Sequence, residues 1–190
     1  MPANEDRHGV LYVIVCAAPH AREIGELVTR AQSAGWTVCV VATPQAIKFI
    51  DIAELEQRTG YPVRHEYKHP DEPDVLPAAD AMIVCPATFN TINKWAVGIS
   101  DTLAVGLLTE AIGLRLPLVA VPSVNSAQAV HRAFARSLAD LRAMGVTVLY
   151  GPGHESGPAD RSGQPGAHDS GIEPWDWDLP LTALHARSAT

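Results

Sequence analysis

Short apolar runs rich in β-branched residues alternate with amphipathic segments, and this alternation restricts the possible folds more than any other feature of the chain. Gly9 to Ala18 is apolar throughout, as expected of a strand buried on both faces. The segment that follows ends at Gly35 and has the apolar spacing of a helix. Its apolar positions are Ile24, Leu27, Val28 and Ala31.

The same alternation continues along the chain. Further strands are predicted in "WTVCVVAT", "YPVRHEY", "DAMIVC", "LPLVAVP" and "VTVLYG". Helices are predicted in "PQAIKFIDIAELEQRTG", in one long segment from Asn90 to Gly113, and in "SAQAVHRAFARSLADLRAMG". Alternating strands and helices are typical of a parallel sheet whose connections are right-handed. We therefore expect an α/β fold, a Rossmann-like doubly wound parallel sheet with helices on both faces.

The composition changes at Gly151. Residues 151–174 contain six glycines and four prolines and show no apolar periodicity, which predicts a flexible C-terminal flap. We expect residues 1–150 to form one domain and residues 151–190 to form the flap and tail. The stretch "PWDWDLP" carries two tryptophans, which we expect to dock onto the body of the chain or onto a neighbouring subunit.

Charge and composition exclude several classes of function. The net charge of -7 and the pI of about 5.5 argue against a surface for nucleic acid or anionic membrane. The apolar runs are too short to cross a bilayer, and the polar start "MPANEDRHG" is unlike a signal peptide, so we expect a cytoplasmic protein. The cysteines Cys16, Cys39 and Cys85 form no CxxC pair and are expected to be buried reduced thiols. The histidines are scattered, and we expect no metal site.

Polar residues follow the predicted strands where ligands bind in parallel sheets, at the carboxyl ends. The richest such stretch is "PATFNT", which places Thr88, Asn90 and Thr91 at the start of a helix. A helix start is a natural anion site, so a phosphate-bearing ligand is one interpretation and capping by Asn90 or Thr88 is the other. The stretch "VPSVNSA" offers the same choice, since Asn125 could cap a helix or bind a carboxylate. Neither GxGxxG nor GxxxxGK[ST] is present.

Several spaced segments together resemble the homo-oligomeric flavin-containing cysteine decarboxylase family. That family carries a Pro-Ala-Ser-Ala-Asn-Thr run followed by Lys, Gly and Asp at set intervals. Here the run is "PATFNT", followed by Lys94, Gly98 and Asp101. The resemblance also includes "GWTVCVVATPQAIKFI", "LPLVAVPSVN" and "LRAMGVTVLYGPG", and it extends over about residues 9–153.

The resemblance implies FMN as cofactor and assigns residues to its binding site. The phosphate would lie at "PATFNT", and the loops after the other strands would reach the rest of the flavin. The implied cofactor residues are Ala17, Ala18, Pro19, Thr43, Gln45, Thr88, Phe89, Asn90, Thr91 and Ser123. Members of the family assemble as trimers or multiples of trimers with FMN near the subunit interface. That implies a homo-oligomer in which Phe89 and Trp95 are partly exposed on a single subunit.

The catalytic pattern of the family is only half present. Its active-site histidine corresponds by position to Glu72 here, and the nearest histidines are His65 and His69, of which we take His69 as the candidate catalytic residue. The family asparagine that binds the substrate carboxylate corresponds to Asn125. The resemblance thus implies oxidative decarboxylation of a small molecule or peptide that ends in a cysteine-type thiol carboxylate.

Two other functions stay open at this point. Glu72 in place of histidine favours an FMN-binding protein without decarboxylase activity, such as a carrier or regulatory subunit. A flavin prenyltransferase, a related FMN fold, would need basic residues for a dimethylallyl phosphate. Candidates for that role are Arg115, Arg132 and Arg136.

Overall fold

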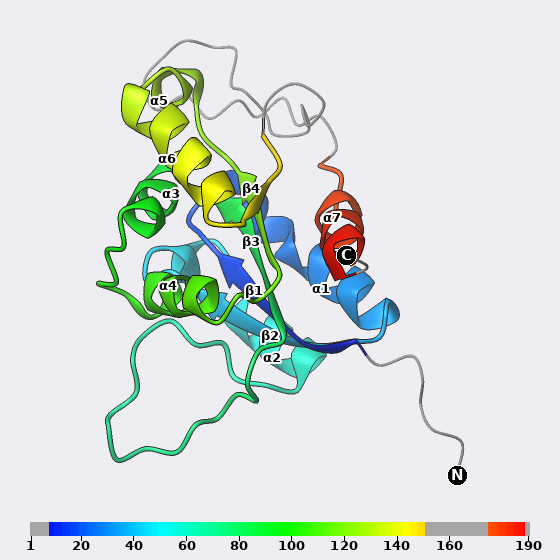
Figure 1. The fold of residues 1–190 in the computed structure, drawn as a ribbon. Coiled ribbons are helices and arrows are strands. Elements are labelled where there is room, and N and C mark those ends of the chain that lie inside the picture. The colour runs from blue at the N-terminus through cyan, green and yellow to red at the C-terminus, as the bar shows by residue number, and fades with distance from the viewer. Residues whose placement is uncertain (1–7, 151–174, 189–190) are drawn as a thin grey trace.

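Five parallel strands form the centre of the molecule, in the order β2-β1-β3-β4-β5 (Figure 1). The structure, a computed structural model, describes residues 8–150 and 175–188. The strands are β1 (Gly9–Val15), β2 (Trp36–Ala42), β3 (Ala81–Ala87), β4 (Leu118–Pro122) and β5 (Thr147–Val148). On one side of β1 lies β2, and on its other side lie β3, β4 and β5 in that order. This order confirms the predicted doubly wound α/β sheet.

Helices cover both faces of the sheet. The α-helices are α1 (Ile24–Ser33), α2 (Ile52–Thr59), α3 (Phe89–Ala96), α4 (Leu103–Gly113), α5 (Ser126–Ala129), α6 (Arg132–Ala143) and α7 (Leu179–Ser188). Two 3-10 helices, η1 (Pro19–Glu23) and η2 (Ala46–Lys48), follow β1 and β2. In Figure 1, α1 and α7 lie on one side of the sheet and α3, α4 and α6 on the other. Within the described residues, no helix has the length and apolarity needed to span a membrane.

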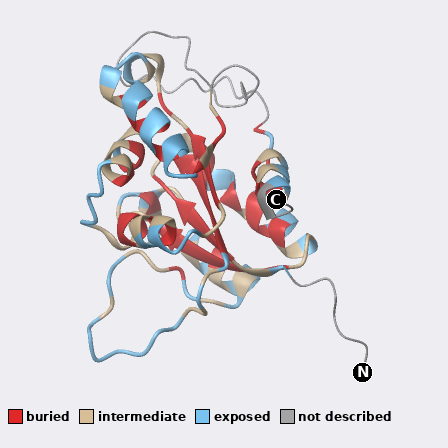
Figure 2. Cartoon of the chain, viewed as in Figure 1, coloured by how far each residue is buried: buried red, intermediate tan, exposed pale blue. Residues whose placement is uncertain are grey.

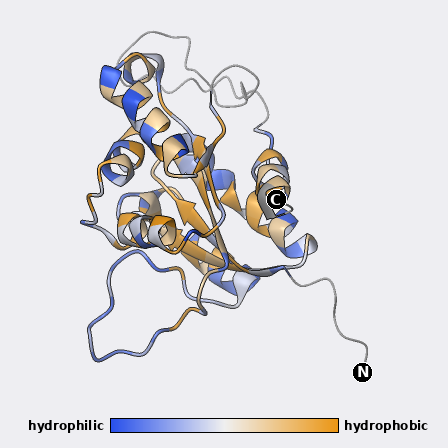
Figure 3. Cartoon of the chain, viewed as in Figure 1, coloured by the Kyte–Doolittle hydropathy of each residue, from blue (hydrophilic) through white to orange (hydrophobic). Residues whose placement is uncertain are grey.

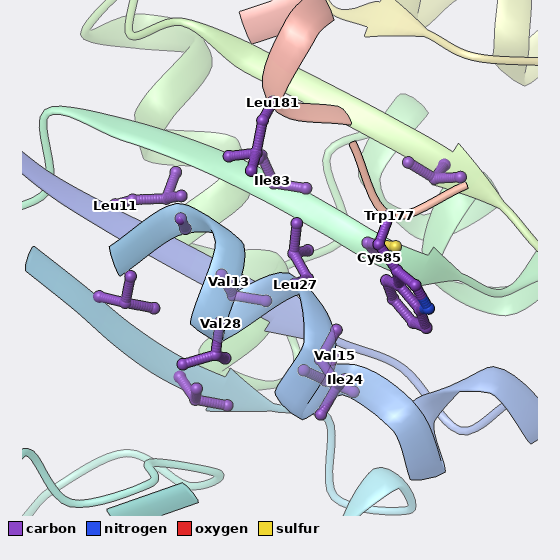
Figure 4. Packing of buried hydrophobic residues seen from close by; sticks show 14 of the residues in the cluster. Leu11, Val13, Val15, Ile24, Leu27, Val28, Ile83, Cys85, Trp177 and Leu181 are labelled. Atoms are coloured by element: carbon purple, nitrogen blue, oxygen red, sulfur yellow. The ribbon is translucent and has the colours of Figure 1, made fainter. Parts of the chain in front are cut away.

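Alternation along β1 divides the core into two clusters. Leu11, Val13 and Val15 face α1 and α7, whereas Tyr12 and Ile14 face the α3, α4 and α6 side. Figure 4 shows the first cluster, in which side chains from α1 and the C-terminal segment meet those of the sheet. The strands are buried over most of their length and strongly apolar (Figures 2 and 3). Burial on both faces explains why these strands read as continuous apolar runs.

Three predicted elements differ from the observed ones in the first half of the chain. The strand predicted over Gly9 to Ala18 ends at Val15, where the chain turns into η1. The helix predicted from Pro44 to Gly60 is η2 followed by α2, because Asp51 accepts a hydrogen bond from the Glu54 N–H (3.0 Å) and begins a new helix. The stretch "YPVRHEY" is no strand, since it makes only an isolated bridge between Arg64 and Val41.

The single helix predicted from Asn90 to Gly113 is two helices. α3 ends at Ala96, and Gly98 has φ of 75°, a left-handed conformation that stops a helix. The ammonium of Lys94 on α3 pairs with Asp101, just before α4, at 2.5 Å. The predicted helix over "SAQAVHRAFARSLADLRAMG" is likewise divided into α5 and α6, because His131 caps α6 through Nδ1 at 3.1 Å from the Ala133 nitrogen.

The C-terminal segment docks onto the body of the same chain. Trp175 and Trp177 are each only 6% exposed and join the first core cluster, as do two leucines of α7, Leu181 and Leu184. Arg30 on α1 pairs with Asp178 at 2.6 Å. Of the two docking sites considered for the tryptophans, the body of the same chain is thus the observed one. The flap predicted over 151–174 lies outside the described residues, and the domain boundary at residue 150 stays a prediction.

The docking of α7 predicts a measurable contribution to stability. Leu184 is fully buried, so Leu184→Ala is expected to lower the free energy of unfolding by about 2–5 kcal/mol. Thr182→Ala on the exposed side of the same helix is expected to change it by less than about 0.5 kcal/mol. Urea unfolding of both variants measures the difference, and equal effects would contradict the observed packing of α7.

Candidate functional site

A cavity of about 470 Å³ opens at the carboxyl ends of the strands. It lies where β1 and β3 are neighbours, and the chain leaves these two strands in opposite directions along the sheet. The loops after β1, β2, β3 and β4 all contribute walls to it. Ligands of doubly wound sheets bind at this position, so the cavity is the candidate functional site.

The structure brings together every residue predicted to hold the cofactor. The cavity is lined by Ala17, Ala18, Pro19, Thr43, Gln45, Thr88, Phe89, Asn90, Thr91 and Ser123, and also by Asn125. Its lining also includes residues that the sequence did not single out for the site: His20, Pro44, Lys94, Thr102, Val105, Val124 and Gln128. The role of each residue toward a ligand stays a prediction.

Backbone hydrogen bonds between the strand ends align the loops around the cavity. These bonds run from Thr43 N to Val15 O (2.8 Å), from Cys16 N to Pro86 O (3.1 Å) and from Ser123 N to Ala87 O (2.8 Å). Each bond joins the beginning of one loop to the neighbouring strand. The sheet itself therefore positions the beginning of each of these loops.

Two helices begin at the cavity without a side-chain cap. Thr88 precedes α3 and Thr102 precedes α4, and both have extended backbone conformations, but neither side chain accepts a hydrogen bond from its helix. The hydroxyl of Thr88 instead donates to Thr91 Oγ1 (3.2 Å), which also accepts from the Cys16 thiol (3.3 Å). Capping by the Thr88 or Asn90 side chain is therefore not observed. The free N–H groups at the start of α3 are the donors that an anion would need.

Asn125 does cap a helix, and it uses only half of its amide to do so. Its Oδ1 accepts a hydrogen bond from the Gln128 N–H (2.8 Å) at the start of α5. Within the described part of the chain, its Nδ2 group has no hydrogen-bond partner. The two interpretations of this residue are therefore compatible, because the oxygen caps the helix while the two N–H donors remain available to a ligand.

His69 lies away from the cavity of its own chain. It belongs to the long loop between α2 and β3, which projects from the body (Figure 2), and its side chain is 69% exposed. Its backbone N–H donates to Glu72 Oε2 (3.0 Å), and its ring lies 3.4 Å from the Asp71 carboxylate. The structure thus supports no contact between this histidine and the cavity within one chain.

Trp95 is buried rather than partly exposed, contrary to what the resemblance implied. Its side chain is 1% exposed, and the indole N–H donates to the carbonyl of Leu108 (3.1 Å). The reason is the break between the helices, which lets α4 fold back against α3. Phe89 is half-buried, as expected. The arginines considered for a prenyl phosphate, Arg115, Arg132 and Arg136, do not line the cavity, so the described residues do not favour a flavin prenyltransferase.

The cysteines are free and buried, as predicted. Burial raises the pKa of the Cys16 thiol and raises the pKa of Cys39 to about 11. Burial also raises the pKa of Cys85. Because the thiolate is the reactive form, these raised pKa values favour the unreactive thiol near neutral pH.

Burial of His20 makes stability depend on pH. Burial lowers the pKa of this imidazole from its ordinary value of 6.5, so below that pH the unfolded chain binds a proton that the folded chain does not. The free energy of unfolding is therefore expected to fall as the pH falls from 6.5 toward the lower folded pKa. His20→Gln should flatten this part of the curve, measured by urea unfolding between about pH 5 and 8. A parent and a variant with parallel curves below pH 6.5 would contradict the burial of the neutral ring.

Comparison with known proteins identifies the family. The family model described as "Flavoprotein" matches residues 2–168. The coenzyme A biosynthesis bifunctional protein CoaBC of Thermococcus kodakarensis is 32% identical over 165 residues, which cover 83% of this chain but only 40% of that protein. The phosphopantothenoylcysteine decarboxylase of Mus musculus is 31% identical over 163 residues and covers 78% of this chain and 76% of its own length.

A solved structure agrees in fold. The FMN-dependent cysteine decarboxylase TvaF from thioviridamide biosynthesis superposes with a TM-score of 0.69 at 21% identity, and the match covers 93% of this chain and 98% of that one. At this identity, the likeness concerns the fold alone. The family model, however, extends over most of the sequence. The chain belongs to the Flavoprotein family.

Proposed function

We propose that the chain binds FMN in the cavity and uses it to decarboxylate a cysteine-type thiol carboxylate oxidatively. One observation supports this proposal above all others. The four loops predicted to hold FMN line a single cavity, and α3 begins there with its N–H groups uncapped. The volume of about 470 Å³ lies within the range of about 300–1,000 Å³ usual for small-molecule sites.

The residues present fit the phosphate of FMN. The start of α3 supplies backbone N–H donors and the positive end of a helix dipole. Thr88, Asn90 and Thr91 add side-chain donors, and Lys94 adds a positive charge, which its ion pair with Asp101 orients. A phosphate would satisfy the backbone N–H groups at the start of α3, which no side chain caps, and the Thr88 hydroxyl would turn from Thr91 toward it.

The chain's own residues would bind and orient the substrate for the reaction. FMN, when bound, accepts two electrons from the thiol side of the substrate. The substrate then loses carbon dioxide, so the overall change is the loss of one carbon dioxide and two hydrogens to leave an enethiol. Asn125 Nδ2 would donate hydrogen bonds to the carboxylate before it departs, and Phe89 and Val105 supply apolar parts of the cavity wall.

The relatives support the substrate class. The mouse relative is named for phosphopantothenoylcysteine, and TvaF is named as a cysteine decarboxylase. The chain spans well under half of the bifunctional CoaBC relative, so the complete activity of that protein is not assigned to it. A homo-oligomer, a trimer or a multiple, remains part of the proposal, since a neighbouring subunit could bring a loop such as that of His69 to this cavity.

Loss of one hydroxyl donor should weaken FMN binding. Thr88→Val removes the hydroxyl and retains the shape, so FMN affinity is expected to fall roughly tenfold, the effect of about one hydrogen bond to a charged group. Thr37→Val is the matched control, because Thr37 lies near the amino end of β2 and the cavity lies at the carboxyl ends of the strands. This substitution should leave the FMN affinity unchanged. Titration of apoprotein with FMN, followed by quenching of flavin fluorescence, gives both dissociation constants. A colourless protein that cannot be loaded with FMN would refute the proposal itself.

Two substitutions of Asn125 should separate its effect on substrate binding from its effect on helix capping. Asn125→Asp retains the oxygen that caps α5 but replaces the donors with a negative charge, so kcat/KM for decarboxylation is expected to fall at least about tenfold with FMN affinity unchanged. Asn125→Ala, which also loses the cap, should in addition lower the free energy of unfolding by about 1 kcal/mol.

The protein is incubated with phosphopantothenoylcysteine and with peptides that end in cysteine. Mass spectrometry of these substrates then measures the expected loss of carbon dioxide and two hydrogens. A yellow protein that changes none of these substrates would instead support the FMN-binding protein without decarboxylase activity.

A further inference from the structure

His20 is a buried polar residue at the cavity that the proposed chemistry does not yet use. It lies in η1, directly after the loop formed by Ala17, Ala18 and Pro19, and it lines the same cavity as they do. The hydrogen bond from Ala21 N to Ala18 O (2.9 Å) closes the turn around it. Only 7% of the residue is exposed.

The C-terminal segment fixes the His20 ring. The ring centroids of His20 and Trp175 are 4.3 Å apart, with an angle of 34° between the ring planes. Trp175 in turn packs against Trp177 (5.8 Å), and both tryptophans belong to the same core cluster as Cys85 on β3. The imidazole is therefore packed between the first cavity loop and a buried tryptophan, which leaves it little freedom to turn.

One ring nitrogen of His20 is buried without a partner. Nδ1 has no hydrogen bond to any described residue. An unpaired buried polar atom is unfavourable, and at a cavity a ligand, an ion or water can supply the missing partner. Burial lowers the pKa of the ring, with the charge of Glu23 a smaller opposing effect. A neutral imidazole offers one hydrogen-bond donor and one acceptor, and the edge of a flavin ring carries groups that can pair with either.

We propose that His20 is a ligand-contacting residue of this cavity, whose neutral imidazole exchanges a hydrogen bond with bound FMN while Trp175 holds the ring in position. This inference rests on the proposed FMN site and adds to it a residue outside the phosphate-binding stretch. The opposing interpretation is that His20 only fills space beneath Trp175. The two differ in what the ring nitrogens do when FMN binds.

Three substitutions at His20 distinguish these interpretations. His20→Phe retains an aromatic ring without nitrogen, whereas His20→Asn and His20→Gln place an amide near the former Nδ1 and Nε2 positions respectively. FMN affinity, measured by quenching of flavin fluorescence, should fall roughly tenfold in His20→Phe and recover to within about threefold of the parent in one of the amide variants. His185→Phe, on α7 and outside the cavity lining, is the control and should bind FMN like the parent.

Nitrogen-15 NMR of the histidine side chains adds a readout independent of activity. Addition of FMN should shift a ring nitrogen of His20 and leave those of His185 in place. His20→Phe with parental affinity would overturn the inference, as would a loss that neither amide variant reverses. In both cases FMN binding by the parent would still stand. A parent that binds no FMN would overturn both the inference and the proposed function.

The role of Trp175 is tested by a double-mutant cycle. If Trp175 positions the His20 ring, Trp175→Phe should weaken FMN binding roughly threefold in the parent and have no further effect in the His20→Phe background. Equal losses in the two backgrounds would show that Trp175 acts independently of His20 and would remove it from the inference. Thermal unfolding of each apoprotein shows whether the variants remain folded under the conditions of the titration.

Discussion

The pairing of β1 with strands on both sides is the constraint on which the remaining structure depends. β1 pairs in parallel with β2 from Gly9 to Val15 and with β3 from Leu11 to Ile14. Because its neighbours continue the sheet in opposite directions, the loops at its carboxyl end diverge and leave a cavity between them. The bonds from Thr43 to Val15 and from Cys16 to Pro86 extend this pairing into the loops. The position of the candidate site is therefore a direct result of strand order.

The break between α3 and α4 gives the site its polar character. A single long helix from Asn90 would offer the cavity one helix start, whereas the two observed helices both begin there, after Thr88 and Thr102. The chain between them turns at Gly98 and is tied back by the pair of Lys94 and Asp101. The same turn buries Trp95 against α4. One local interruption thus supplies both a packed second layer and an additional set of unpaired backbone donors.

Local signals were enough to predict the sheet and the positions of most helices, while the predicted cofactor residues came from the family resemblance and are a part of the cavity lining. Some breaks could also have been found locally, since Asp51 followed by Glu54 is a capping pattern and Gly98 is a typical helix end. The contribution of His20 was not accessible in this way. Its burial depends on Trp175, which is remote in sequence and separated from it by a glycine- and proline-rich stretch without periodicity. The exposed position of His69 likewise follows from the path of a long loop, which no short pattern specifies.

The docking of Trp175 onto His20 also sets an order of events during protein synthesis. The ribosome makes the chain from its N-terminus, so all five strands and the first cavity loop emerge before the tryptophan that covers that loop. A nascent chain that has completed its sheet still lacks the tryptophan that packs on the His20 ring, and it gains this contact only when residue 175 has left the exit tunnel. We therefore expect the packing of Trp175 on His20 to form late in biogenesis, after all five strands have been made.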